Sequence, residues 1–269
     1  MPDLLVDKHD GIMTITFNRP QVRNAFSPEL LVSLSAAWHE YRDDKSLRVA
    51  ILTGAGDIAF TAGGDLKLLM PLFTGARQAE TETEKHFMSD VGNIMGAALL
   101  RPFELYKPVI AAINGYALAG GTEIIQSTDI RIASSNATFG LTEVQRGLVP
   151  GGGSMARLAR QIPYCKAMEM LLTGDSLSAE EACRIGFINE VVPPERLMPR
   201  AYEFAERLAK NAPLAMQACK ETVLRSSGME LNDAYALEHE LSQPVVMSKD
   251  AREGPRAFAE KREPNYIGE

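Results

Sequence analysis

The sequence has few of the residues from which disulfide frameworks and metal sites are built. Its 269 residues include only three cysteines, which lie far apart and form no C-x-x-C pair. The four histidines have no spacing typical of metal ligands. This scarcity excludes a disulfide-stapled secreted domain and a zinc-binding module. We expect a reduced, cytoplasmic protein that binds no metal.

Long apolar runs and an excess of positive charge are also absent. No apolar run approaches the roughly 20 residues that a membrane-spanning helix needs. The net charge is −7 and no cluster of Lys and Arg forms a stripe, which argues against binding that neutralises nucleic-acid phosphates. The segment MPDLLVDKHDG is short and acidic, unlike a secretory signal or a transit peptide. We therefore expect neither a nucleic-acid partner nor a membrane partner.

The apolar residues that are present predict an α/β core. The chain is 45% hydrophobic and 23% charged, which is ordinary for a globular protein. Residues 11–17 alternate apolar and polar side chains, a pattern that predicts a half-buried strand. The continuous apolar runs at 48–53 and 107–113 predict strands covered on both faces. Residues 129–133 and 186–192 have the pattern of shorter strands.

Helical patterns occupy most of the remaining chain. Ser27 precedes a helical run and is a predicted N-cap. Residues 71–105 are helical but irregular, typical either of a variable segment beside a site or of a solvated helix face. After residue 163 the pattern is almost wholly helical. We predict an α/β core over residues 1–200 and a helical C-terminal region over residues 201–269.

Two motifs suggest functions that their surroundings do not support. GAGDIA at 54–59 follows a predicted strand and matches the dinucleotide-binding pattern G-x-G-x-x-G/A. The residues after it, FTAGGD, cannot open the helix that would bind the phosphates. GGSMA at 152–156 nearly matches the nucleophile elbow of hydrolases. A turn, LVPGG, precedes the serine instead of a strand, so we predict Ser154 in the first turn of a helix.

Three glycine-bearing segments form a more specific pattern, at 59–66, 114–124 and 139–153, and two of them carry an isolated acid, Glu123 or Glu143. A glycine N–H can approach a ligand oxygen because no Cβ is in the way. Two such donors on one oxygen form an oxyanion hole, worth roughly 3–4 kcal/mol per donor. Two nearby carboxyls can divide acid and base work. From these residues alone, a catalytic site and a pair of glycine turns with surface glutamates are equally open.

The motifs as a set resemble those of the crotonase, or enoyl-CoA hydratase/isomerase, superfamily. They include GIMTITFNRPQVRNAF, AFTAGGDL, PVIAAINGYALAGGTEI, FGLTEVQRGLVPGGG, LLTGDSLSAEEACRIGFINEVV and AFAEKREPNY. Their order and spacing match the family over nearly the whole chain. The resemblance implies an α/β spiral of β-β-α turns with a helical C-terminal region used in trimerisation. It also implies a homotrimer, with trimers pairing into a hexamer.

The resemblance further implies a role for each residue of the pattern. Gly64 and Gly120 would donate the two oxyanion N–H groups to the thioester oxygen of an acyl-CoA substrate. Glu123 would orient and activate water at Cβ, and Glu143 would exchange a proton at Cα or with that water. Retention of both acids favours hydration of trans-2-enoyl-CoA to 3-hydroxyacyl-CoA over isomerisation, or dehydration of a specialised acyl-CoA. A thioesterase using Ser154 and a non-catalytic CoA-binding relative fit the residues less well.

The same resemblance predicts how the CoA part of the substrate is bound, with no separate cofactor. Backbone groups of 62–66 would line the adenine pocket, and cations would lie near the phosphates, one of them reaching from a neighbouring helix. The residues expected to contact the CoA substrate are Arg23, Ala25, Ala62, Gly63, Asp65, Leu66, Lys67 and Lys261. The chain departs from the family pattern where Gly64 replaces a common alanine and PGGGSMARL replaces PGAGGTQRL. Neither departure removes a predicted catalytic group.

Overall fold

The computed structural model describes residues 1–269 and contains two sheets. The larger sheet has the strand order β1 (Leu4–His9), β2 (Ile12–Phe17), β3 (Val49–Gly54), β5 (Val109–Ile113), β7 (Ile130–Ser134) and β10 (Glu190–Val192). All neighbours in it are parallel except the β1–β2 hairpin. The smaller sheet has the order β4 (Ala59–Thr61), β6 (Tyr116–Leu118), β8 (Thr138–Gly140) and β9 (Ser176–Ser178). The predicted α/β architecture is confirmed.

The helices before the C-terminal region lie between these strands in the sequence. They are α1 (Pro28–Asp43), α2 (Met70–Phe73), α3 (Glu82–Ser89), α4 (Val91–Ala98), α5 (Gly120–Ile125), α6 (Ser154–Gln161), α7 (Tyr164–Thr173), α8 (Ala179–Arg184) and α9 (Leu197–Ala209). Three short 3₁₀ helices are η1 (Pro20–Val22), η2 (Thr142–Arg146) and η3 (Pro194–Arg196). Ser27 is the N-cap of α1, as predicted, because its hydroxyl accepts a hydrogen bond from the Leu30 N–H at 3.2 Å.

The large sheet separates two apolar clusters, and the alternation of its strands assigns side chains to each. In β3, Ala50 and Leu52 join the cluster on one face, whereas Val49 and Ile51 join the cluster on the other. The second cluster also contains apolar residues of α9. Because both faces are covered, the central strands can be apolar throughout, as the sequence predicted.

Strand β2 differs from the prediction because α9 covers the face that was expected to be solvated. Thr14 is only 8% exposed, and its hydroxyl is hydrogen bonded to the Tyr202 hydroxyl at 2.9 Å. The strand is therefore buried on both faces rather than half-buried. The boundary expected at residue 200 falls inside α9, whose packing on the sheet continues through Ala205. A helix far along the sequence thus completes the covering of the sheet.

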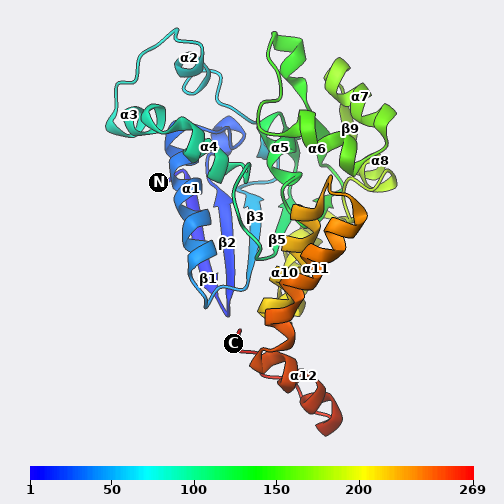
Figure 1. Ribbon diagram of the computed structural model, residues 1–269. Helices are drawn as coiled ribbons and strands as arrows, with labels where there is room; N and C mark the ends of the chain where they lie inside the picture. Colours follow the sequence, from blue (N-terminus) through cyan, green and yellow to red (C-terminus); the bar gives the residue numbers. More distant parts are fainter.

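The irregular segment 71–105 forms α3, α4 and the end of α2, and it packs on the helix α1 side of the sheet (Figure 1). Helix α3 begins with a capping box in which Thr81 and Glu84 exchange hydrogen bonds. Helix α4 is followed by Leu100, which has a left-handed backbone with φ of 53° and is held by burial in the core. Phe87 and Ile94 are also buried in this core, so the segment packs against it at three points.

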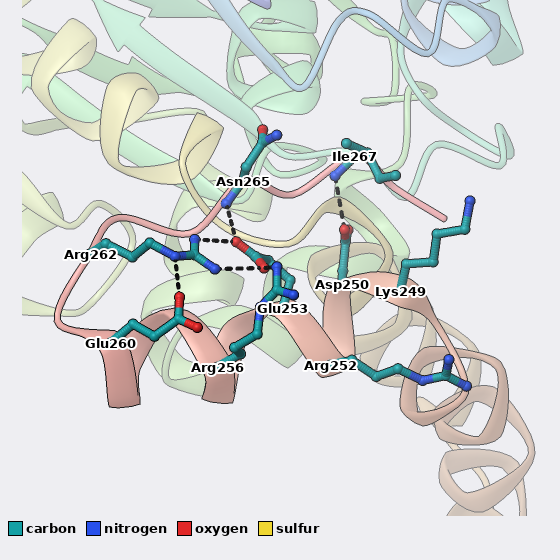
Figure 2. Close-up of a pocket in the computed structure, with 9 residues that line it drawn as sticks. All are labelled: Lys249, Asp250, Arg252, Glu253, Arg256, Glu260, Arg262, Asn265 and Ile267. Carbon is teal, nitrogen blue, oxygen red and sulfur yellow. Dashed lines mark hydrogen bonds and ion pairs between the residues drawn. The ribbon is translucent and has the colours of Figure 1, made fainter.

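Three C-terminal helices follow α9, and the last of them extends away from the core (Figure 1). They are α10 (Pro213–Ser226), α11 (Leu231–Val246) and α12 (Lys249–Glu260). The residues after α12 turn back along it and enclose a charged hollow of about 760 Å³, shown in Figure 2. There, the Asp250 and Glu253 carboxylates accept backbone N–H groups from the returning tail. No helix of the chain combines the length and apolarity needed to cross a membrane.

Candidate active site

The small sheet places the three glycine-bearing segments at one edge. Strands β4, β6 and β8 run parallel and adjacent, in that order. The chain leaves their carboxyl ends at residues 62–66, 119–123 and 141–146, respectively. Carboxyl ends of neighbouring parallel strands share one edge, where ligands commonly bind in α/β sheets. The topology therefore brings together segments that lie more than 70 residues apart.

The first two segments touch through their backbones. A Cβ added at Gly63 would lie 2.7 Å from the Ala119 Cβ and 3.0 Å from the Gly120 nitrogen. Gly63 also has a φ of 83°, which favours glycine. At Gly120, an added Cβ would lie 3.1 Å from the Phe26 ring and 3.7 Å from the Gly63 Cα. Glycine is thus favoured at 63 by both space and conformation, whereas a side chain at 120 would fit only if the Phe26 ring moved slightly.

This contact places the two predicted N–H donors on adjoining segments. Gly120 is the first residue of α5, and the helix's first hydrogen bond runs from Glu123 N–H to the Ala119 carbonyl at 3.1 Å. The Gly120 N–H therefore has no acceptor within its helix and lies at the positive end of the helix dipole. Gly64 pairs with Phe26 in a parallel bridge, yet its own N–H donates to no backbone carbonyl. Both donors are free to bind a ligand oxygen.

A strained residue joins strand β6 to helix α5. Ala119 has φ of 52° and ψ of −122°, a combination uncommon for a residue with a side chain. Its carbonyl accepts the first α5 hydrogen bond, and its N–H donates to the Gly140 carbonyl of β8 at 2.8 Å. These bonds on both sides of the turn hold the unusual conformation. Strain of this kind is concentrated at functional sites.

Glu123 projects from the first turn of α5 into the core and is only 4% exposed. The Ser154 N–H donates to its Oε1 at 3.4 Å. A Cβ at Gly152 would lie 2.6 Å from its Oε2, so only glycine leaves room for the carboxyl there. Burial and the nearby Glu143 carboxyl raise the Glu123 pKa to about 7, against the lowering effect of the Ser154 and Gly152 N–H groups. Near neutrality the group exchanges a proton readily.

Glu143 lies in η2, after the third strand of the edge, and is partly buried. Its Oε2 atom is buried and has no hydrogen-bond partner. Burial is the largest influence on the carboxyl and raises its pKa. A buried acceptor without a partner is uncommon unless a ligand or water completes it. The structure therefore brings Glu143 into the electrostatic reach of Glu123 with an oxygen available for exchange.

Ser154 begins α6, which confirms its predicted place in the first turn of a helix. It is fully buried, and its Oγ accepts a hydrogen bond from Gln126 Nε2 at 2.6 Å. A hydrolase would need an acid and a histidine beside this serine, and Asp175 and His239 follow it in the sequence order of that family. Both side chains are exposed, and neither is hydrogen bonded to Ser154. The Ser154 hydroxyl therefore forms a structural hydrogen bond with Gln126 and is not placed to act as a nucleophile.

The residues predicted to bind the CoA part fall into two groups. Arg23, Ala25 and the segment 62–67 lie together, because the Ala62 N–H donates to the Arg23 carbonyl at 2.9 Å. Lys261 directly follows α12, which lies at the opposite end of the folded molecule from α2 and α5 (Figure 1). A single chain does not bring it to the site. Contact with Lys261 therefore stays a prediction that requires a second copy of the chain.

Asp65 has an internal role that sequence reasoning did not identify. Its carboxylate accepts hydrogen bonds from the Lys67 N–H at 2.9 Å and the Leu68 N–H at 3.1 Å. The buried Arg19 guanidinium contacts it at 3.0 Å and also binds the Ala25 carbonyl. These groups together lower its pKa although burial opposes them. Arg19 and Asp65 are 46 residues apart and meet only in the folded chain. The arginine of the NRP motif therefore could not be assigned this role from the sequence.

Comparison with solved structures identifies the fold of this chain. Its whole length superposes on the crystal structure of enoyl-CoA hydratase EchA1 from Mycobacterium marinum, with a TM-score of 0.88, 39% identity, and coverage of 100% of each chain. The shared architecture is the crotonase fold.

Sequence comparison gives the family. The enoyl-CoA hydratase/isomerase family matches residues 7–269. Enoyl-CoA hydratase EchA19 of Mycobacterium tuberculosis is 42% identical over 265 residues, covering 98% of this chain and 96% of the relative. Carnitinyl-CoA dehydratase of Citrobacter koseri is 41% identical over 267 residues, covering 97% of each. The chain belongs to the enoyl-CoA hydratase/isomerase family, and it is an enzyme of the lyase type that these relatives represent.

Proposed function

We propose that this enzyme adds water across the double bond of a trans-2-enoyl-CoA to give a 3-hydroxyacyl-CoA. One observation carries the proposal. Two free glycine N–H groups, at Gly64 and Gly120, lie at a single edge of the small sheet with the buried carboxyl of Glu123 and the partly buried carboxyl of Glu143. The donors suit a thioester oxygen that gains negative charge, and the carboxyls suit the movement of two protons.

The proposed steps follow from these groups. The thioester oxygen accepts both N–H bonds, which polarises the enoyl group and lowers the energy of the enolate. Glu123, as carboxylate, takes one proton from a water molecule while the water oxygen bonds to Cβ. Glu143, as carboxylic acid, gives a proton to Cα as the enolate collapses. The raised pKa of Glu123, about 7, suits proton exchange near neutrality, and burial also raises the pKa of Glu143.

The CoA part is proposed to lie along the segment 62–67. Backbone groups of Ala62, Asp65 and Leu66 line the adenine pocket, while Arg23 and Lys67 face the phosphates. The internal bonds of Asp65 support a backbone role, since its carboxylate is already occupied by Arg19 and two N–H groups. Coenzyme A then belongs to the substrate, and the reaction requires no further cofactor.

A homotrimer, pairing into a hexamer, is the proposed assembly. Apolar side chains on α10 and α11 support it, because Val223, Leu224 and Val246 are more than half exposed. Exposed apolar patches of this kind commonly mark interfaces. In such an assembly, Lys261 of one copy reaches the CoA phosphates bound to another.

A second candidate reaction is dehydration of a specialised acyl-CoA, which is the same chemistry in reverse. The similarity to carnitinyl-CoA dehydratase supports it. Isomerisation of a double bond has less support, because family members that only isomerise generally lack one of the two glutamates that this chain retains. The same groups serve both reactions, so the acyl group and the equilibrium decide the direction.

Crotonyl-CoA with separate absorbance and thiol readouts tests the proposal. Hydration removes the absorbance of the conjugated enoyl thioester and releases no thiol. Hydrolysis would release one thiol for each substrate consumed. We expect absorbance loss without thiol, and conversion of 3-hydroxybutyryl-CoA back to the same equilibrium mixture. Absence of hydration with crotonyl-CoA and with longer, branched and aromatic enoyl-CoA esters would contradict the proposal.

A further inference from the structure

A buried hydrogen-bonded pair, Gln126 and Ser154, joins the end of α5 to the start of α6. Gln126 Nε2 donates to Ser154 Oγ at 2.6 Å and to the Thr122 carbonyl at 3.0 Å. The two residues are 3% and 0% exposed. Both N–H bonds of the amide are therefore used, whereas Gln126 Oε1 is buried without any partner. An orphaned buried oxygen is destabilising because it has lost its hydrogen bonds to water and gained none in the protein.

The same two elements also hold the Glu123 carboxyl. Gln126 follows Glu123 by three residues, so both side chains leave α5 on the same face. Gln126 binds the side chain of Ser154, and Glu123 Oε1 accepts the backbone N–H of that same residue at 3.4 Å. Ser154 is thus fixed at two points by residues one helical turn apart. The two bonds therefore connect the position of the Ser154 N–H relative to Glu123 with the Gln126 side chain.

We propose that Gln126 and Ser154 are positioning residues that hold the start of α6 against the Glu123 carboxyl and so stabilise its ionised, water-activating form. The role of that form rests on the proposed hydration. The Gly152 and Ser154 N–H groups at the beginning of α6 favour a carboxylate over a carboxylic acid. The orphaned Gln126 oxygen fits a residue kept for its two donors rather than for stability.

The other charges that face Glu123 come from three elements. Glu143 of η2 favours its protonated form, while Arg101 after α4 favours its ionised form. Arg157 of α6 interacts with Glu123 as well. Removing the Gln126–Ser154 bond leaves these three groups in place and loosens only the α6 backbone donors. The pKa of Glu123 should then rise, and the acidic limb of the pH–rate profile should move to higher pH.

The experiment measures the titration of Glu123 in two ways. In the first, kcat for crotonyl-CoA hydration is recorded from pH 5 to 9 for wild type, Gln126→Leu and Ser154→Ala. In the second, infrared spectra of the substrate-free proteins follow the carboxylic acid band that Glu123→Gln removes. We expect both variants to shift the limb and the band upward by about one pH unit, with about tenfold lower kcat at pH 6 and little change in KM.

Two further variants separate positioning from packing. Ser154→Thr keeps the hydroxyl and should restore the wild-type titration. Thr128→Val removes a buried hydroxyl that binds the Ile125 carbonyl at 2.7 Å, and should lower the melting temperature without shifting the titration. If Gln126→Leu does not fold, Ser154→Ala decides the matter, because it removes one oxygen only.

An unshifted Glu123 band in Ser154→Ala would overturn the inference and leave the pair a packing contact. A shift of equal size in Thr128→Val would overturn it as well. If wild type hydrates no enoyl-CoA, the proposed function fails, yet the infrared titration still decides whether the pair controls Glu123.

Discussion

The edge of the small sheet and the C-terminal helices use buried and exposed groups in opposite ways. At the edge, charged or polar groups that would normally face water are buried, among them Glu123 and the unpaired Glu143 oxygen. In α10 no residue is buried, and in α11 only Leu237 is. Apolar side chains there face outward instead. The first region leaves a buried polar atom without a partner, whereas the second leaves apolar side chains exposed to solvent.

The largest expected effect comes from the two acids at the edge. Glu143→Gln and Glu123→Gln should each lower kcat about 10²- to 10⁴-fold, because a positioned proton-transfer group contributes on that order. Affinity for a CoA ester and the assembly state should change little, which would separate the edge from the C-terminal helices. Steady-state kinetics and sedimentation of each variant measure the two properties. A variant within about threefold of wild-type kcat would remove that glutamate from the chemistry.

Replacement of Gly120 should come next in size. In Gly120→Val the Cβ would meet the Phe26 ring. We expect the larger side chain to displace the thioester oxygen from the proposed donor. Loss of one oxyanion donor should lower kcat by roughly 10²- to 10³-fold, with a smaller change in substrate affinity. The melting temperature must be measured alongside, since crowding also destabilises the fold. A stable, assembled Gly120→Val enzyme with near-normal kcat would refute the oxyanion assignment.

The burial of Glu123 also predicts how stability depends on pH. Its pKa of about 7 exceeds the ordinary value of 4.5, so between these values the folded chain binds more protons than the unfolded chain. Stability therefore falls as pH rises through this window, by about 3 kcal/mol in full. Glu123→Gln should be more stable than wild type by about that amount above pH 7, and equal to it below pH 4. Denaturant unfolding at a series of pH values measures the difference.

A matched acid with the opposite environment provides the control. Arg77 and two backbone N–H groups lower the Glu84 pKa to about 2. Stability from this group is present above its ordinary pKa and lost as pH falls, so Glu84→Gln should destabilise the protein at pH 7. If Glu123→Gln destabilised it in the same way, the raised Glu123 pKa would be wrong.

The smallest expected effects concern the cations, and they connect the two regions. Arg23→Ala, Lys67→Ala and Lys261→Ala should raise KM for the CoA ester severalfold, more at low salt, because exposed charges are screened. Arg252→Ala, an exposed cation on α12 without an ion pair, is the control. The Lys261 effect should disappear in a dissociated chain, since one chain does not bring Lys261 to the site. Unchanged KM in all three variants would contradict the CoA placement.

Elements with a strong local signal could be predicted from the sequence. Continuous apolar runs indicated β3 and β5, and Ser27 marked the start of α1 because its hydroxyl caps the helix locally. The burial of Thr14 was not predictable in this way, since it depends on α9, more than 180 residues further along the chain. Local periodicity describes one face of a strand and does not show what covers the other.

For the candidate site, too, the sequence indicated the residues that form local motifs and not the side chains that support them. The residue pattern indicated three glycine-bearing segments with the acids Glu123 and Glu143, and the family resemblance assigned Gly64 and Gly120 as donors. The small sheet brings these segments together. The side chains that hold them, Arg19 on Asp65 and Gln126 on Ser154, were missed because each bond joins distant segments through ordinary polar residues. Lys261 shows a different limit, since its proposed partner belongs to another copy of the chain.

The double variant Glu123→Gln/Glu143→Gln tests most directly whether both acids act on one reaction at this edge. Its kcat for crotonyl-CoA should be compared with those of the two single variants under identical conditions. Groups that act as one unit are strongly non-additive, so the double change should lower kcat little more than the more damaging single change. If instead the loss in the double variant equals the product of the two single losses, the acids act independently, and the account in which both serve one reaction step is contradicted.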